Sequence, residues 1–203
     1  HPRVITILVA RALPGVVRIG FITYVSIIVV RLLNGTPLQA GVLYALWSLL
    51  AATGASQAGR IADLFGSRDT QLVVIHVCLA AGFTAVMFAP GILVAGIGTV
   101  VSGAASGLSI TLYRTLITGF APGSLRGGLV SIGSTGGRIT MTLTPVAMGG
   151  FIAFAAPAIG FDAAVRFAGL GAAVVGGGGG IVCVLVARGS SPIAIESTGA
   201  NPD

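Results

Sequence analysis

The sequence contains no lysine, and charged residues of either sign are scarce. Only 8% of the 203 residues are charged, whereas 55% are hydrophobic. A soluble globular domain carries about 25% charged residues, because solvated side chains must cover its core. So little charge excludes an ordinary water-soluble domain. All eleven basic residues are arginines placed one or two at a time, so we expect no nucleic-acid partner, which would require a clustered basic face.

Cysteines and acidic residues are also few. Cys78 and Cys183 lie in apolar stretches without CxxC spacing, so both are interpreted as small hydrophobic side chains. The apolar stretches hold no Asp or Glu, which supply catalytic carboxylate pairs and many metal ligands. The glycine run 176–180 lacks a P-loop lysine. We therefore expect no enzyme activity, no metal and no cofactor.

The sequence has long apolar stretches instead. A helix needs about 20 apolar residues to cross the hydrocarbon layer of a membrane. Six stretches of this length predict an all-α membrane protein with six transmembrane helices. We predict a cytoplasmic segment at 1–11, the six-helix bundle at 12–187 and a disordered cytoplasmic tail at 188–203. The predicted spans are 13–33, 38–58, 70–89, 92–117, 127–154 and 167–187.

The arginines are distributed unevenly about these spans. If the N-terminus is cytoplasmic, seven arginines fall at or near the inner side, and only Arg31 and Arg166 fall at the outer side. Cytoplasmic loops of membrane proteins are enriched in basic residues. The bias predicts a multi-pass plasma-membrane protein with both termini in the cytoplasm. The inner residues are Arg3, Arg11, Arg60, Arg68, Arg114, Arg126 and Arg188.

Glycine is abundant, with 32 residues that lie mostly inside the predicted spans. Small residues four positions apart let two helix backbones approach closely in a membrane. Gly103 and Gly107 have this spacing in the fourth span, and Gly176 and Gly180 have it in the sixth. We predict close helix packing at both pairs. The alternative is that these stretches bend during a conformational cycle.

Two segments that lie three spans apart are similar. Pro-Leu-Gln-Ala-Gly-Val-Leu at 37–43 opens the second span, and Ser-Leu-Arg-Gly-Gly-Leu-Val at 124–130 opens the fifth. The two helices run in opposite directions across the membrane. This arrangement is what a 3+3 inverted repeat predicts.

The loop between the second and third spans carries the most informative motif. Its sequence over 59–68, Gly-Arg-Ile-Ala-Asp-Leu-Phe-Gly-Ser-Arg, resembles the Gly-x-x-x-Asp-(Arg/Lys)-x-Gly-x-(Arg/Lys) loop of the major facilitator superfamily. Gly59, Asp63, Gly66 and Arg68 match that pattern, while a leucine stands at 64 where a basic residue is usual. The superfamily places this loop on the cytoplasmic side, between the second and third helices of a half.

The resemblance implies a gating role for the loop, which in the superfamily is taken to stabilise the outward-open state. Asp63 is expected to pair with an arginine at the inner side, and Arg114 and Arg126 are the candidate partners. Gly59 would permit close helix approach, and Gly66 would permit a turn with positive φ. The alternative interpretation is a solvated turn with one ion pair.

The fifth predicted span resembles a second helix of the same superfamily. Arg-Ile-Thr-Met-Thr-Leu-Thr-Pro over 138–145, followed by the glycine pair 149–150, is similar to the family's Arg-x-Gly-x-x-x-Gly-Pro…Gly-Gly helix. Thr140 and Thr144 replace two glycines of that pattern. Pro145 is expected to kink the helix.

Members of the superfamily have twelve helices, and this chain has room for six. The resemblance therefore implies one six-helix half of a major-facilitator fold. The start at His1 and the polar tail favour the C-terminal half. The expected partners are the lipid bilayer, a small-molecule substrate, and either the N-terminal half of the same transporter or a second copy of the chain.

Arg138 is the strongest candidate for a substrate cavity. It lies twelve residues after Arg126, which is about 18 Å along a helix and places it near the middle of the bilayer. A charge at that depth is costly and by default indicates function. Arg138 is a candidate counter-charge for an anionic substrate or for a carboxylate of the other half. The alternative is a structural hydrogen bond to backbone carbonyls.

Arg18, Tyr24 and Trp47 are further cavity candidates, because they lie in the first and second spans. The alternative for Arg18 is that its side chain extends to the membrane interface. The alternative for the two aromatic residues is ordinary packing. His76, in the third span, is interpreted as a packed neutral side chain.

These features together predict a secondary transporter that moves a small solute by alternating access, with proton-coupled efflux as one form of it. Because the spans hold no acidic residue, a proton-binding carboxylate would come from the other half. The alternative function is a non-transporting membrane scaffold or sensor that retains the fold.

Overall fold

The computed structural model describes residues 2–64, 67–120 and 125–189, with the backbone alone for 2, 3, 62–64 and 120. Within these ranges the chain forms helices joined by short connections and no strand, which confirms the predicted all-α class. Two short segments, η1 and η3, are π-helical. The elements are α1 (Pro2–Ala12), α2 (Pro14–Ile27), η1 (Ile28–Leu32), α3 (Pro37–Leu64), α4 (Arg68–Met87), α5 (Ile92–Phe120), α6 (Arg126–Ile159), α7 (Phe161–Ala173), η3 (Val174–Gly178) and α8 (Gly179–Gly189).

Within the described ranges, six helical segments are long and apolar enough to cross a membrane, as predicted. The first joins α1, α2 and η1 over Val4–Leu32, and the sixth joins α7, η3 and α8 over Phe161–Gly189. Both begin earlier than the sequence predicted and include Arg11 and Arg166, which donate hydrogen bonds to backbone carbonyls of other helices. The other four spans are α3, α4, α5 and α6.

Local chemistry explains where α3 begins. The Thr36 N–H donates to Gln39 Oε1 at 2.8 Å, and the Gln39 N–H donates to Thr36 Oγ1 at 3.2 Å. This reciprocal capping satisfies two donors that the first turn would otherwise leave open. Pro37, the first residue of α3, has no N–H to satisfy. At the connection between α6 and α7, Gly160 has a φ of 84°, a left-handed conformation that favours glycine.

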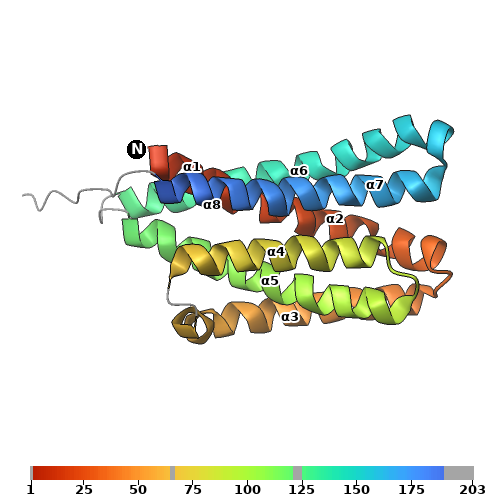
Figure 1. Cartoon of the computed structure of the whole chain (residues 1–203), viewed down its shortest axis with the longest axis horizontal. Helices are drawn as coiled ribbons and strands as arrows, with labels where there is room; N and C mark the ends of the chain where they lie inside the picture. Colours follow the sequence, from red (N-terminus) through yellow and green to blue (C-terminus); the bar gives the residue numbers. More distant parts are fainter. Residues whose placement is uncertain (1, 65–66, 121–124, 190–203) are drawn as a thin grey trace, which may run out of the picture.

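The helices form an elongated bundle (Figure 1). α5 packs against both α3 and α4, while α6 packs along α1, α2 and α7. α1 begins and α8 ends at the same end of the bundle. We call this the arginine-rich end, because it carries Arg60, Arg68, Arg114, Arg126 and Arg188. The opposite, arginine-poor end carries Arg31 and Arg166.

Glycines bring α5 against α3 backbone to backbone. A Cβ added at Gly103 would lie 2.9 Å from the carbonyl oxygen of Trp47. A Cβ at Gly107 would overlap the carbonyl oxygen of Ala51. Both approaches exclude a side chain, which confirms the close packing predicted for this pair.

The glycine pair of the sixth span is also in close contact. A Cβ at Gly176 would lie 2.7 Å from Val17 Cγ2, and a Cβ at Gly180 would overlap the imidazole of His76. The second predicted pair is therefore confirmed as well. Gly98, which the sequence did not single out, makes a similar approach between α5 and α4.

Candidate functional site

The predicted gating loop lies at the arginine-rich end, between α3 and α4. Gly59 is exposed in α3, and a Cβ there would meet no described neighbouring atom within 4 Å. Close helix approach therefore does not explain this glycine. Arg68 is the exposed first residue of α4. Gly66 and the side chain of Asp63 lie outside the described residues, so the predicted ion pairs of Asp63 stay predictions.

The two arginines expected to pair with Asp63 share this end of the bundle. Arg114 is exposed near the end of α5, and Arg126 is the first residue of α6. Asp63 is in the last turn of α3, at the same end. Their placement on three different helices is compatible with a contact that holds helix ends together.

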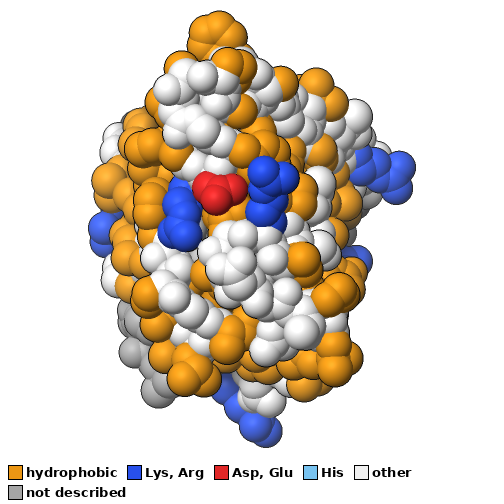
Figure 2. Space-filling model, turned by 90° about the vertical axis from the view of Figure 1, so that its right-hand side faces the viewer, with side chains coloured by type: hydrophobic (Ala, Val, Ile, Leu, Met, Phe, Trp, Pro, Cys, Tyr) orange, Lys and Arg blue, Asp and Glu red, His pale blue; other side chains and the backbone are white. Residues whose placement is uncertain are grey.

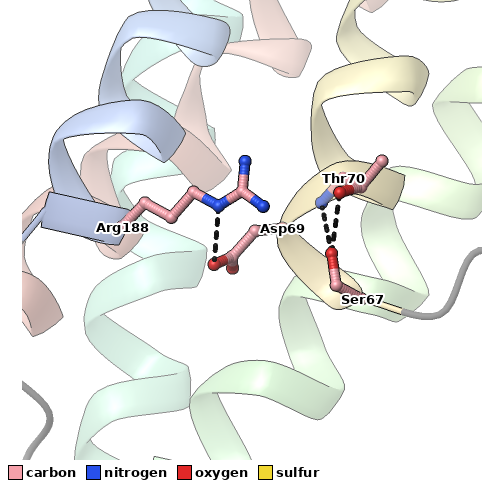
Figure 3. Close-up of polar contacts among 4 residues, drawn as sticks. All are labelled: Ser67, Asp69, Thr70 and Arg188. Atoms are coloured by element: carbon pink, nitrogen blue, oxygen red, sulfur yellow. Dashed lines mark hydrogen bonds and ion pairs between the residues drawn. The ribbon is translucent and has the colours of Figure 1, made fainter.

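An ion pair that the sequence analysis did not predict joins α4 to α8 at this end. Arg188 Nε lies 3.8 Å from Asp69 Oδ2, and both side chains are partly exposed (Figure 3). Ser67 caps α4 by accepting a hydrogen bond from the Thr70 N–H at 3.2 Å. The helix dipole also favours an acidic residue in the first turn. One feature of the sequence could have indicated this acidic residue: Asp69 lies two positions after Ser67, a residue type that often caps a helix.

The arginine-poor end has an ion pair of its own. Arg31 Nε lies 3.6 Å from Asp162 Oδ1, and the Arg31 guanidinium lies 4.2 Å from the centroid of the Phe161 ring. Figure 2 looks onto this end and shows an acidic side chain beside basic ones. Arg166 Nη1 donates to the carbonyl oxygen of Met87 at 3.0 Å. The carboxylate of Asp162 is thus neutralised at the end of the bundle.

A polar cavity of about 220 Å³ lies between α1, α2, α5 and α6. Two of the predicted cavity residues, Arg18 and Arg138, line it. A third arginine, Arg11, lines it as well. The polar side chains in its walls are Arg11, Arg18, Ser106, Ser109, Tyr113, Ser134 and Arg138.

Arg11 is held against α6 from the opposite wall of the cavity. Its Nη1 donates to the carbonyl oxygen of Val130 at 3.4 Å, and its Nη2 donates to Ser134 Oγ at 3.3 Å. Gly133 leaves the space for this side chain, because a Cβ there would overlap Arg11 Nη1. The Arg11 guanidinium is therefore positioned by contacts to α6 but is not neutralised by them.

The other two arginines have weaker partners. Arg18 Nη2 lies 3.5 Å from Met141 Sδ, and a thioether sulfur is a weak acceptor. The guanidinium of Arg138 is exposed and has no hydrogen-bond partner among the described residues. The structural alternative for Arg138, a bond to backbone carbonyls, is not seen within the described ranges.

All three arginines lie inside the spans. Arg11 and Arg18 are seven and fourteen residues beyond Val4, where the first span begins, or about 10 Å and 21 Å along a helix. Arg138 lies about 18 Å beyond the start of α6. The hydrocarbon layer is about 30 Å thick. Arg18 and Arg138 are therefore well inside their helical segments, farther from the helix starts than half of that thickness.

Tyr113, which α5 contributes to the cavity wall, contacts the buried His76. The Tyr113 hydroxyl lies 3.3 Å from His76 Nε2, and His76 Nδ1 lies 2.8 Å from the carbonyl oxygen of Leu72. The carbonyl can only accept, so we assign the proton to Nδ1 and let the Tyr113 hydroxyl donate to Nε2. This geometry fits the packed neutral side chain expected for His76.

Tyr24 and Trp47, which were predicted for the cavity, pack between helices and do not line it. The Tyr24 hydroxyl donates to the carbonyl oxygen of Pro145 at 3.3 Å. Trp47 stacks on Phe21, with 5.6 Å between ring centroids. Pro145 lies inside α6, where its missing N–H leaves the Met141 carbonyl without its usual helical donor. The predicted kink coincides with the point at which Tyr24 is bonded to α6.

The sequence analysis placed Arg11 before the first span, whereas the structure places it in the cavity wall. One signal was available: Arg11 and Arg18 are seven residues apart, so they share one helix face. Ser134 and Arg138, four residues apart, share a face of α6 for the same reason. The serines of α5 gave no such signal, because the sequence does not say which face of that helix meets α2 and α6.

No protein-family model and no curated protein matches the chain. The likeness to the major facilitator superfamily therefore rests on the residues of the loop and of the fifth span alone. Among the described residues, no group of three His, Cys, Asp or Glu side chains is arranged to hold a metal ion. Function has to be argued from the cavity and its charges.

Proposed function

We propose that this chain is one six-helix half of a secondary transporter that moves a small solute by alternating access. The polar cavity near the middle of a bundle of apolar helices carries the proposal. Charged side chains at that depth are costly, and in membrane proteins they mark substrate paths and water-filled cavities. Arg18 and Arg138 meet this description from two different helices.

The outer surface of α6 supports a second half or a second copy as the partner. Ser131, Thr135, Arg138 and Thr142 recur at helical spacing and are all exposed. A polar stripe on a membrane span is stable against water or protein rather than against lipid. This stripe would line the path between two halves, continuous with the cavity behind it.

The contacts at the arginine-rich end suit a gate that opens and closes. The ion pair of Asp69 and Arg188 is partly exposed, and such pairs contribute only about 0–1 kcal/mol. A contact of this strength holds helix ends together yet is readily broken in a conformational cycle. We place this end in the cytoplasm of a plasma-membrane protein, because membrane proteins retain basic residues on that side.

The test is solute flux into proteoliposomes that contain the protein expressed from its complete coding sequence. A panel of labelled small solutes is offered under an imposed proton gradient. We expect accumulation of at least one solute, and we expect Asp63→Asn to impair it while membrane insertion stays intact.

Asp162→Asn is the matched control, because it makes the same change at the arginine-poor end. Unchanged flux in Asp63→Asn would overturn the gating role of the loop. Absence of flux for every solute, in protein that is folded and inserted, would overturn the transporter and leave the scaffold or sensor alternative.

A further inference from the structure

We propose that the cavity lined by Arg11, Arg18 and Arg138 binds the carboxylate or phosphate group of a small anion. The proposal rests on the proposed function in one respect, since it names the class of solute that such a transporter would carry. Binding of an anion can nevertheless be measured without transport.

The first argument is charge balance. Three arginines line one cavity, and each guanidinium is positively charged at any physiological pH. Both carboxylates described by the structure, Asp69 and Asp162, are paired with other arginines at the two ends of the bundle. No described carboxylate therefore neutralises the cavity. A bound anion would supply the missing negative charge.

The second argument is hydrogen bonding. A guanidinium offers five N–H donors and no acceptor, and its planar fork matches the oxygens of a carboxylate or phosphate. Arg18 has only a thioether sulfur as a partner, and Arg138 has none among the described residues. Two sets of strong donors thus converge on a cavity whose described walls leave them unused. A cation would be repelled by them, and a neutral ligand could accept hydrogen bonds but would supply no counter-charge.

The third argument is size. The cavity of about 220 Å³ is smaller than the pockets of about 300–1,000 Å³ that take drug-sized molecules. Serine hydroxyls of α5 and α6 add neutral hydrogen-bonding groups beside the arginines. These dimensions suit a small anion with one or two acidic groups.

The fourth argument is the path from the arginine-rich end. By their positions along the helices, Arg11 and Arg114 lie nearer that end than Arg18 and Arg138 do. Positive charges placed between that end and the cavity raise the local concentration of anions and draw them inward. Gly133 leaves room for the Arg11 guanidinium at the cavity wall.

An acidic group of this kind has two sources, a free anion and the headgroup of an anionic lipid. Basic pockets between transmembrane helices near the cytoplasmic side bind acidic headgroups as well. The two sources share one recognition chemistry. The experiment therefore needs one arm for each.

The experiment measures the thermal stability of the purified protein in a neutral detergent. Sodium phosphate and sodium malonate form the free-anion arm, and sodium chloride at equal ionic strength is their control. Short-chain phosphatidylglycerol forms the lipid arm, with short-chain phosphatidylcholine as its control. We expect phosphate or malonate to raise Tm with a saturable dependence on concentration, beyond any effect of chloride. A rise with phosphatidylglycerol alone would keep the anion site and assign it to a lipid.

Variants locate the binding. Arg138→Gln and Arg18→Gln should weaken the apparent affinity about tenfold or more, because each removes charge-assisted hydrogen bonds. Arg60→Gln, which removes an exposed arginine of α3 outside the cavity, should leave the affinity unchanged. Gly133→Ala keeps every charge but displaces the Arg11 guanidinium, so it should weaken binding even if an arginine variant fails to fold. Gly128→Ala, in open space on the same helix, is its control.

Two outcomes would overturn the proposal. One is that neither the free anions nor phosphatidylglycerol stabilise the protein more than their controls. The other is that the cavity variants, Gly133→Ala included, keep the affinity of the unaltered protein. Saturable anion binding without flux of any solute would uphold the site and reject the transporter. Flux of a solute without anion binding would uphold the transporter and reject the anion site.

Discussion

The fourth and fifth spans, α5 and α6, are both long helices rich in glycine, serine and threonine, yet they have different surroundings. In α5, 50% of the apolar stretch is buried inside the bundle, whereas in α6 only 17% is. α5 is packed against α3 and α4, while one side of α6 stays open. Helices of similar composition are therefore packed inside the bundle in one case and open on one side in the other.

The glycines show the difference most directly. Those of α5 at 98, 103 and 107 each face the backbone of a neighbouring helix at a distance that excludes a Cβ. In α6, added Cβ atoms at 127, 128, 137 and 150 would meet nothing within 4 Å. Small residues in α5 allow helix contact. In α6 they leave open space on one side and room for Arg11 on the other.

The polar side chains differ in the same way. Thr99, Ser102 and Ser109 of α5 are buried and bond to carbonyls of their own helix. Thr135 and Thr142 of α6 bond to their own helix as well, but they are exposed on the face that carries Arg138. A hydroxyl satisfied by its own helix is compatible with lipid, protein or water. Arg138, which lies on the same face as Thr135 and Thr142, identifies this face of α6 as polar.

The largest effect on stability is expected at the crossing of α5 and α3. Gly107→Ala should lower the free energy of unfolding by about 1–3 kcal/mol or more, because the new methyl group overlaps the Ala51 carbonyl and forces the helices apart. Thermal unfolding in detergent measures it. Gly128→Ala in α6 should be neutral or stabilising by up to about 1 kcal/mol, since alanine favours helix and the site is open. Equal losses of stability in Gly107→Ala and Gly128→Ala would contradict the difference in packing between α5 and α6.

The next effect, which does not exceed the first, is expected where α5 contacts α4. Tyr113→Phe should cost about 1–3 kcal/mol, because it leaves the buried Nε2 of His76 without its donor. Tyr44→Phe, on the exposed side of α3, is the matched control and should change little. Chemical unfolding of both variants compares the two sites. No loss in Tyr113→Phe would mean that His76 does not depend on this hydroxyl.

The smallest effect compares two threonines. The Thr111 hydroxyl of α5 donates across to the carbonyl oxygen of Ala55 in α3 at 3.2 Å, so Thr111→Val should cost about 0.6 kcal/mol, the average for such bonds in membranes. The Thr142 hydroxyl bonds only to the Arg138 carbonyl of its own helix. Thr142→Val should therefore be close to neutral in thermal unfolding. A larger loss at Thr142 than at Thr111 would show that the exposed face of α6 contributes to stability.

Much of the fold was predictable, because membrane spans are encoded by length and hydropathy. The six spans and the close packing at Gly103, Gly107, Gly176 and Gly180 followed from such local patterns. The span boundaries were less accurate where an arginine lies inside a helix. The acceptor that holds the Arg11 side chain, the Val130 carbonyl, lies more than a hundred residues away in the sequence, so no local pattern indicated it.

The candidate site was predictable only in part. Arg18 and Arg138, which line the cavity, were singled out because a charge deep in an apolar span is conspicuous by itself. Tyr24 and Trp47 were assigned to the cavity from the spans they occupy, but the faces they present are set by packing against α6 and Phe21. Asp69 was passed over because its partner, Arg188, lies at the other end of the sequence.

The sequence by itself determined that this protein is a bundle of six apolar helices with its arginines concentrated at one end, because hydropathy and charge are local properties of the chain. Only the tertiary structure decided that Arg11, Arg18 and Arg138 share one cavity. Their convergence depends on how α1, α2 and α6 are rotated and paired. That choice is made by contacts between helices, such as Arg11 with Ser134 and Tyr24 with Pro145, which join residues more than a hundred positions apart.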